Sequence, residues 1–300
     1  MNAATNDPLR CPDCLGSLDR GAGARCSRCG ARYGLSDGIL DLLGSKSAIN
    51  RSELETQDRV SDYYENARYK HAFSRAYHEH TLDILLRAAE PRGSILDDGC
   101  GNGIFIEHLR ERGAGVTRFF GIDLSFGMLR HARRRHEDLD LPGAVVRADA
   151  CRLPFADSSF DVVYARSLLH HLPDPSEGVR EIARVLKPGG TMVALDPNKT
   201  FVSELPRAIS RKSEHFDDDH KNFALGELVG LIEPHLHIER TEFVGYVAYP
   251  LLGFPDLMNF GRYLPLDSLA PSLMRLDDVL ARVPVVRRLA WGVVLSATKQ

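Results

Sequence analysis

Ile95-Leu96-Asp97-Asp98-Gly99-Cys100-Gly101-Asn102-Gly103 is a short apolar run that enters a glycine-rich turn. A second apolar run, Phe119-Phe120-Gly121-Ile122-Asp123, ends in an acid twenty residues after the last of these glycines. Glycine lets the backbone approach a ligand closely at a strand-to-helix turn. An acid at the tip of the following strand accepts hydrogen bonds from ribose hydroxyls. We therefore expect a nucleoside-containing cofactor at the carboxyl ends of these two strands.

The spacing of the glycines distinguishes between classes of cofactor. A dinucleotide-binding turn of the form G-x-G-x-x-G needs glycine at position 104 or 106, where the chain has Ile104 and Ile106. The observed pattern from Gly99 to Gly103 is G-x-G-x-G. This pattern resembles motif I of the class I S-adenosylmethionine (SAM) dependent methyltransferases.

Three downstream segments resemble further parts of the same family. Val145–Ala150 reads as a strand with an acid at its end, and Ser159–Ala165 contains the Phe-Asp-Val-Val sequence common in the family. Residues 186–195 hold a turn followed by a strand. The alternation of strands and helices predicts a parallel, doubly wound sheet. The resemblance implies an α/β fold over residues 91–300, with a Rossmann-like, seven-stranded SAM methyltransferase sheet and helices on both faces.

Bulk composition is that of an ordinary globular enzyme. The 300 residues are 43% apolar and 26% charged, and the net charge of −3 gives no whole-chain attraction to nucleic acid or to an anionic membrane. Met1–Leu9 lacks the order of charges and apolar residues found in a signal peptide. No apolar run approaches the roughly 20 residues of a transmembrane segment. We therefore expect a cytoplasmic protein, in which thiols serve as metal ligands more often than as disulfides.

The cysteines near the N-terminus predict a metal site. Four of the six form two C-x-x-C pairs, eleven residues apart: Cys11, Cys14, Cys26 and Cys29. Tetrahedral Zn²⁺ takes four such thiolates, and a site closed by four protein ligands is structural rather than catalytic. Tyr33–Leu43 resembles the end of a Trm112-like zinc-binding module. We expect a small zinc ribbon over residues 1–44.

A linker and an N-terminal helical cap are predicted over residues 45–90. In the enzymes that this chain resembles, a helix before the first strand folds over the SAM pocket, often with a tyrosine that closes it. Tyr63 or Tyr64 takes that place in this sequence, and aromatic packing against the sheet is the alternative.

The last part of the chain departs from the compact core. Glu239–Tyr249 and Trp291–Thr298 are expected to form an antiparallel pair of strands at the sheet edge. Residues 250–289 between them are apolar and interrupted by prolines, and form an insertion. We expect this insertion to be a lid or a wall of the substrate cavity. Ordinary packing, a dimer face and a peripheral membrane contact are the alternatives.

Matching positions in the motifs supply the candidate SAM ligands. The resemblance assigns Asp123 to the ribose diol, Asp149 to the adenine amino group, and Asp97 to the glycine turn and the methionyl ammonium. The other positions that the resemblance places around SAM are Tyr64, Gly99, Cys100, Gly101, Leu124, Met128, Ala150 and Arg166.

Asp98 departs from the family pattern, which has an apolar residue at this position. Because its neighbour Gly99 is expected to face the ligand, Asp98 is expected to point into a helix-covered layer. A buried carboxylate there needs a partner or a raised pKa. Contact with the positive end of the cofactor is the alternative.

Methyl transfer from the sulfonium of SAM is an in-line displacement, which leaves S-adenosylhomocysteine. The protein therefore positions donor and acceptor and removes a proton where the acceptor requires it. Candidate bases are His170 and His171 after the fourth strand and His215 in a charged loop. In the resembling family the second histidine of the pair is chiefly structural.

The sequence predicts methylation of an oxygen or a carbon of a small or lipid-like metabolite. The core resembles the group that contains the quinone-biosynthesis methyltransferases. An alternative is ribosomal RNA methylation of the guanine-N1 type with the ribbon holding RNA, and a third is a non-catalytic SAM-binding partner module. The overall negative charge and the apolar insertion weigh against RNA.

Overall fold

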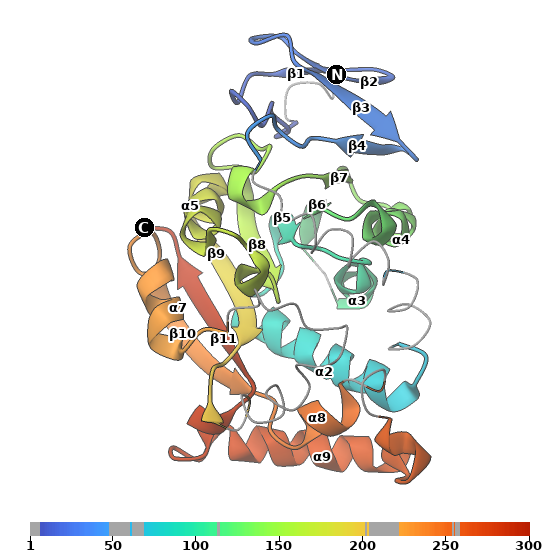
Figure 1. The fold of residues 1–300 in the computed structure, drawn as a ribbon, viewed down its shortest axis with the longest axis vertical. Coiled ribbons are helices and arrows are strands. Elements are labelled where there is room, and N and C mark those ends of the chain that lie inside the picture. The colour runs from blue at the N-terminus through green and yellow to red at the C-terminus, as the bar shows by residue number, and fades with distance from the viewer. Residues whose placement is uncertain are drawn as a thin grey trace.

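One sheet of eleven strands runs through the molecule, in the order β1-β2-β3-β4-β7-β6-β5-β8-β9-β11-β10 (Figure 1). The computed structural model describes residues 7–47, 61, 69–112, 115–201, 203, 222–253, 255 and 259–300. The strands are β1 (Leu18–Arg20), β2 (Gly23–Cys26), β3 (Arg32–Ser36), β4 (Ile39–Asp41), β5 (Gly93–Asp98), β6 (Val116–Asp123), β7 (Gly143–Arg147), β8 (Phe160–Arg166), β9 (Leu186–Pro197), β10 (His237–Val244) and β11 (Gly292–Thr298).

Helices cover both faces of this sheet. They are α2 (Ala72–Ala88), α3 (Ile104–Arg112), α4 (Phe126–Glu137), α5 (Pro175–Val185), α7 (Leu225–Ile232), α8 (Ala248–Leu252) and α9 (Leu266–Leu280), with short 3₁₀ helices η3 (Ala150–Arg152), η4 (Leu169–His171), η5 (Phe260–Arg262) and η6 (Arg287–Leu289). One buried cluster joins the sheet to α5 and α7, and a second joins it to α2, α3 and α4. In β5, Leu96 belongs to the first cluster and Ile95 to the second, as expected for a strand buried on both faces.

The predicted seven-stranded sheet is confirmed as the body of the protein. β7, β6, β5, β8 and β9 run parallel to one another, and β11 pairs antiparallel with both β9 and β10. Five parallel strands therefore end at the same edge, where the glycine turn follows β5.

The cysteine-containing segment extends this sheet, which the sequence did not predict. β4 pairs antiparallel with β3 and parallel with β7, in the register Leu40 to Val146 and Asp41 to Arg147. The edge of β7 is thus covered by a strand from the N-terminal segment.

Side-chain caps fix the starts of two helices beside the carboxyl edge. The Ser125 hydroxyl accepts from the Met128 N–H at 3.1 Å and begins α4. Asp174 accepts from the Glu177 N–H at 3.1 Å and begins α5, with Pro175 at the first helical position. The Ser125 cap comes two residues after Asp123, so the end of β6 and the start of α4 form one rigid corner.

The predicted strand Glu239–Tyr249 is wrong at its end, because β10 stops at Val244. Gly245 has a φ of 76°, a left-handed conformation that turns the chain out of the sheet. The Asp277 carboxylate then accepts from the backbone N–H groups of the next three residues, which are therefore not available to the sheet.

The insertion packs against α2 through its inner face. A third buried cluster consists of Phe73, Tyr77, Ala248, Leu252, Leu266 and Ala270. Figure 1 shows α9 along one end of the molecule, opposite the N-terminal strands. Ordinary packing therefore accounts for the inner side of the insertion. Within the described ranges, no helix is long and apolar enough to cross a membrane.

Candidate functional site

The glycine turn after β5 has an open side and a closely packed side. Gly99, Gly101 and Gly103 have φ values of 78°, 53° and 83°. A Cβ atom on Gly103 would lie 2.6 Å from the Ala132 Cα, so this glycine lets α4 approach the turn. A Cβ atom on Gly101 would meet no heavy atom within 4 Å. The backbone at Gly101 therefore faces open space in which a ligand can lie.

Asp123 holds the glycine turn to the start of α4. One carboxylate oxygen accepts from the Gly101 N–H at 2.9 Å, and the other accepts from the Ser125 N–H at 2.9 Å. Burial raises the pKa of Asp123, and these backbone hydrogen bonds oppose the rise. The half-buried carboxylate lies at the carboxyl end of β6, in the position predicted from the sequence.

Asp97 and Arg166 bring opposite charges to the same edge. Asp97 is 2% exposed, and one of its oxygens has no hydrogen-bond partner among the described residues. Burial raises the pKa of Asp97 to about 7, although the Arg166 guanidinium lowers it. The Arg166 Nε is also buried without a partner in the described part of the chain. A buried acceptor and a buried donor without partners fit a ligand that carries both an ammonium and a carboxylate.

Asp149 contributes a third carboxylate to the edge, just after β7. One oxygen accepts from the Cys151 N–H at 2.9 Å and caps η3. The other is buried and has no partner among the residues that the structure describes. It is therefore available to accept a hydrogen bond from an amino group, as predicted for adenine.

The other predicted ligands surround the same edge with different exposure. Met128 and Ala150 are buried, and Leu124 is half-buried. Cys100 is fully buried, and its sulfur lies 3.1 Å from where a Gly121 Cβ would be. The Cys100 side chain therefore packs against β6, and its backbone N–H donates to the Ile122 carbonyl at 2.8 Å. Tyr64 and His215 lie outside the described residues.

Asp98 is buried as predicted and has no partner. Its side chain is 0% exposed, and neither carboxylate oxygen has a hydrogen-bond partner within the described ranges. Burial raises the pKa of Asp98 well above its usual range, and the charges of Asp97, Asp149, Asp123 and Glu181 raise it further. A buried carboxyl without a partner is expected to have such a raised pKa, because burial disfavours its charged form.

We expect Asp98→Asn to stabilise the protein above neutral pH. Because the folded pKa lies above the unfolded value of about 3.9, wild-type stability is greatest below that value and falls as the pH rises toward the folded pKa. The loss is about 1.4 kcal/mol for each pH unit between the two pKa values, and the neutral amide does not suffer it. Urea unfolding at pH 5 to pH 8 measures the difference. A difference in the free energy of unfolding that does not widen as the pH rises contradicts this account. The same widening for Asp138→Asn, which replaces an exposed carboxylate, would contradict it as well.

His170 and Asp196 form a buried dyad where β8 and β9 end. The His170 Nδ1 lies 2.7 Å from an Asp196 oxygen, which also accepts from the His170 backbone N–H at 3.2 Å. Burial raises the pKa of Asp196, while backbone hydrogen bonds from His170 and Leu169 lower it. A carboxylate in this position orients the imidazole and stabilises its protonated form.

Asp196 is a site residue that the sequence analysis missed. The strand predicted there ended at Leu195, one residue before it. An acid at the carboxyl end of a parallel strand was the available signal, since the same reasoning identified Asp123 and Asp149. His171, the second predicted histidine, stacks on His170 with ring centroids 4.0 Å apart.

The four predicted metal-binding cysteines lie together. Their sulfurs are all within 4.8 Å of one another, with 3.7 Å between Cys11 and Cys29 and 3.5 Å between Cys14 and Cys26. A tetrahedral zinc ion with bonds of about 2.3 Å places its sulfurs about 3.8 Å apart, whereas a disulfide bond is about 2.05 Å long. The sulfur positions therefore fit a tetrahedral metal ion.

Backbone hydrogen bonds favour the thiolate form of Cys26. The Cys26 sulfur accepts from the backbone N–H groups of Arg28 at 3.3 Å and Cys29 at 3.4 Å. Burial opposes ionisation of Cys26, but these N–H groups and the neighbouring thiols lower its pKa to about 6. The Tyr33 hydroxyl lies 3.0 Å from the Cys11 sulfur and donates to Asp13 at 3.1 Å. Such hydrogen bonds to Cys11 and Cys26 are of the kind that surrounds the ligands of a metal ion.

Arg147 connects the cysteine segment to the carboxyl edge. Its guanidinium donates to the Asp41 carboxylate at 3.1 Å and, through Nε, to the Leu124 carbonyl at 2.7 Å. It also lies 4.7 Å from the centre of the Phe126 ring. The Leu42 N–H donates to the Arg147 carbonyl at 2.8 Å. Arg147 therefore fixes the Leu124 carbonyl next to Asp123, and Asp41 of β4 fixes Arg147.

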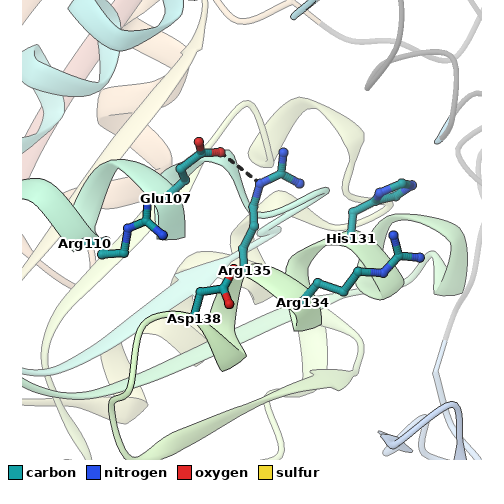
Figure 2. A pocket seen from close by; sticks show the side chains of 6 residues that line it. All are labelled: Glu107, Arg110, His131, Arg134, Arg135 and Asp138. Carbon is teal, nitrogen blue, oxygen red and sulfur yellow. Dashed lines mark hydrogen bonds and ion pairs between the residues drawn. The ribbon is translucent and has the colours of Figure 1, made fainter.

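A shallow groove lies between α3 and α4 (Figure 2). It has a volume of about 260 Å³ and is lined by Glu107, Arg110, His131, Arg134, Arg135 and Asp138. Arg135 pairs with Glu107 at 3.1 Å, as the dashed line in Figure 2 marks. Because its walls carry charges of both signs, this groove does not suit an apolar acceptor.

Comparisons with known proteins agree with this fold. The methyltransferase domain family matches residues 96–194. An uncharacterized chloroplastic methyltransferase from Arabidopsis thaliana is 31% identical over 227 residues, which cover 66% of this chain and 62% of that protein. A demethylmenaquinone methyltransferase from Beutenbergia cavernae is 33% identical over 158 residues, covering 48% of this chain and 62% of that protein. The chain thus spans less than two thirds of the length of these relatives.

Among solved structures, a complex of the Trm112 methyltransferase activator with a methyltransferase from Haloferax volcanii is similar in fold. The TM-score is 0.57 at 22% sequence identity, and the match covers 81% of this chain and 97% of that chain.

Proposed function

We propose that the chain transfers the methyl group of SAM to an oxygen or carbon of a small or lipid-like metabolite, in keeping with the match of residues 96–194 to the methyltransferase domain family. The observation that carries this proposal is the carboxyl edge of the sheet. There Asp123, Asp97 and Arg166 meet beside the open glycine turn, and two of them have buried polar atoms without partners in the described chain. These groups suit a nucleoside that carries an amino acid, as SAM does.

Each group at this edge has a counterpart in SAM. Asp123 binds the ribose hydroxyls, and Asp149 accepts from the adenine amino group. Asp97 binds the methionyl ammonium, and Arg166 binds the carboxylate. When bound, SAM supplies a methyl group activated by its sulfonium. The protein then contributes mainly the placement of the acceptor in line with that methyl group.

We propose that His170 is the general base for the acceptor and that Asp196 is a positioning residue. A hydroxyl or an acidic carbon must lose a proton as the new bond to the methyl group forms, and a neutral imidazole takes such a proton near neutral pH. The hydrogen bond from His170 Nδ1–H to Asp196 directs Nε2 away from the carboxylate. His171 stacks on the base and is the weaker candidate.

We expect His170→Gln to lower kcat about a hundredfold, with unchanged affinity for S-adenosylhomocysteine. Asp196→Asn should lower kcat by about tenfold and shift the pH profile, because the imidazolium loses its partner. Labelled-methyl transfer and calorimetry measure the two quantities. His171→Gln is the matched control, since it removes a histidine from the same turn. An equal loss in both histidine variants would argue against His170 as the base.

The acceptor class can be tested by labelled SAM in a cell extract separated into RNA, lipid and small-molecule fractions. We expect the label in the lipid or small-molecule fraction. The relative named for demethylmenaquinone supports a lipid-like acceptor. Label in RNA, together with a salt-sensitive RNA mobility shift, would favour the RNA alternative. Failure of calorimetry to detect S-adenosylhomocysteine binding would end the proposal that the chain is a methyltransferase.

We propose a structural zinc ion at Cys11, Cys14, Cys26 and Cys29. The distances between sulfurs and the hydrogen bonds to Cys26 support this site. Four protein ligands complete the tetrahedron, so the metal has no open position for a substrate.

A further inference from the structure

The outward side of α9 carries an apolar stripe. Leu269, Leu276 and Val279 follow one another at intervals of seven and three residues, the spacing of one helix side, and Val283 lies just beyond the end of the helix at Leu280. All four are exposed, Val279 to 55%. The inward side carries Leu266 and other residues that pack against α2. The helix is therefore apolar on both its inward and its outward side. Within the described chain, only the inward side is covered by other residues.

Two arginines lie along this stripe. Arg275 is four residues before Val279 and so lies beside it on the helix surface, and Arg282 lies in the turn that directly follows the helix. Both are exposed, and neither forms an ion pair with another described residue. We call Arg275, Arg282 and the apolar stripe the α9 face.

The three acids of the same helix have partners within the protein. Asp267 accepts from the Phe73 N–H at 3.0 Å, and Asp277 binds backbone N–H groups at the start of α8. Asp278 pairs with His80 at 3.2 Å. All three carboxylates are thus partnered within the protein, whereas Arg275 and Arg282 have no ion-pair partner among the described residues.

The segments on either side of α9 continue this arrangement. Tyr263 precedes the helix and is 84% exposed, and Val285 follows it and is 82% exposed. Arg262 lies beside the first, and Arg287 and Arg288 follow the second, all exposed. Apolar side chains bordered by arginines, with a tyrosine at one end, are typical of a helix that lies in a membrane interface.

The arginine-rich end of this surface adjoins the dyad. Asn198 is two residues beyond Asp196, and its side chain donates to the Ala290 carbonyl at 3.1 Å. Its backbone N–H donates to the Trp291 carbonyl at 2.8 Å. The turn that carries Arg288 is therefore fixed to the end of β9, where the proposed base is oriented.

We infer that the α9 face and its flanks dock on an anionic lipid bilayer. The apolar side chains enter the interface, and the arginines bind lipid phosphates. This docking would present a membrane-resident acceptor to the end of the sheet that holds the dyad. The presentation of an acceptor to the dyad rests on the proposed function, whereas docking on the bilayer does not.

A second copy of the chain is a poorer occupant of the same surface. A two-fold contact through the α9 face would bring Arg275 and Arg282 close to their own counterparts, while the carboxylates of the helix are already hydrogen-bonded or paired within the chain. An anionic bilayer satisfies both the apolar stripe and the arginines.

Co-sedimentation of the full chain with vesicles tests this docking. We expect binding to phosphatidylcholine vesicles that contain phosphatidylglycerol, little binding to pure phosphatidylcholine, and loss of binding at high salt. The double variant Arg275→Gln, Arg282→Gln should weaken binding about tenfold or more, since each arginine near such a surface contributes about one factor of five. Val279→Asp should also weaken it.

The matched control is Arg110→Gln, Arg134→Gln, which removes the same charge from the groove of Figure 2. It should leave vesicle binding within about twofold of wild type. Equal loss in both double variants, equal binding to both kinds of vesicle, or a dimer that Val279→Asp dissociates would overturn the inference. Calorimetry with S-adenosylhomocysteine, done without vesicles, reports on the proposed function separately.

Discussion

Replacing Asp123 with alanine is expected to weaken S-adenosylhomocysteine binding roughly a thousandfold. In the proposed complex the carboxylate accepts from two ribose hydroxyls, and a hydrogen bond to a charged group contributes about 1.5 to 3 kcal/mol. The same carboxylate holds the Gly101 and Ser125 N–H groups at 2.9 Å. Its loss therefore removes ligand contacts and also loosens the glycine turn. Isothermal calorimetry of wild type and variant measures the change.

Two variants separate the ligand contacts from the structural hydrogen bonds. Asp123→Asn keeps one acceptor oxygen without the charge, so its affinity should lie between wild type and alanine. Asp161→Ala is the matched control, because Asp161 accepts from the Ser94 N–H at 2.8 Å at the opposite end of β5 and pairs with Lys187. It should lower stability while keeping affinity near wild type. If Asp161→Ala lost affinity to the same degree, the role of Asp123 in binding would have to be abandoned.

Local patterns predicted most of the carboxyl edge. Asp97, Asp123 and Asp149 each follow an apolar run, and parallel strands bring such positions to one edge without any knowledge of side-chain packing. The burial of Asp98 followed from the alternation of strand residues beside Gly99. The same reasoning would have found Asp196, had the last parallel strand been treated like the others.

Long-range pairing was less predictable. β4 joins β7 through only two residue pairs, more than a hundred positions apart in the chain, and neither segment carries a signal for the other. The end of β10 depends on Asp277, whose carboxylate captures N–H groups from a turn about thirty residues earlier. Such contacts are decided by tertiary packing, which propensity and periodicity do not encode.

Because of the unforeseen pairing of β4 with β7, the proposed zinc ion should affect the cofactor site. We expect Cys26→Ser to lose the metal, to lower the melting temperature and to weaken S-adenosylhomocysteine binding about tenfold. A structural zinc site contributes on the order of 10 kcal/mol to the folding of its own segment. Without it, β4 no longer holds Arg147, and Arg147 no longer fixes the Leu124 carbonyl beside Asp123. Metal analysis, thermal unfolding and calorimetry follow the three effects.

Asp41→Asn tests the contact between β4 and Arg147 separately from the loss of the metal. It leaves all four thiolates in place and weakens only the link from β4 to Arg147, so zinc content should stay at one ion per chain while affinity falls by about threefold. Cys151→Ser should change neither zinc nor affinity strongly, since this buried thiol lies outside the cysteine cluster. A metal-free Cys26→Ser protein with wild-type affinity would instead mean that the ribbon covers the edge of β7 without supporting the cofactor site.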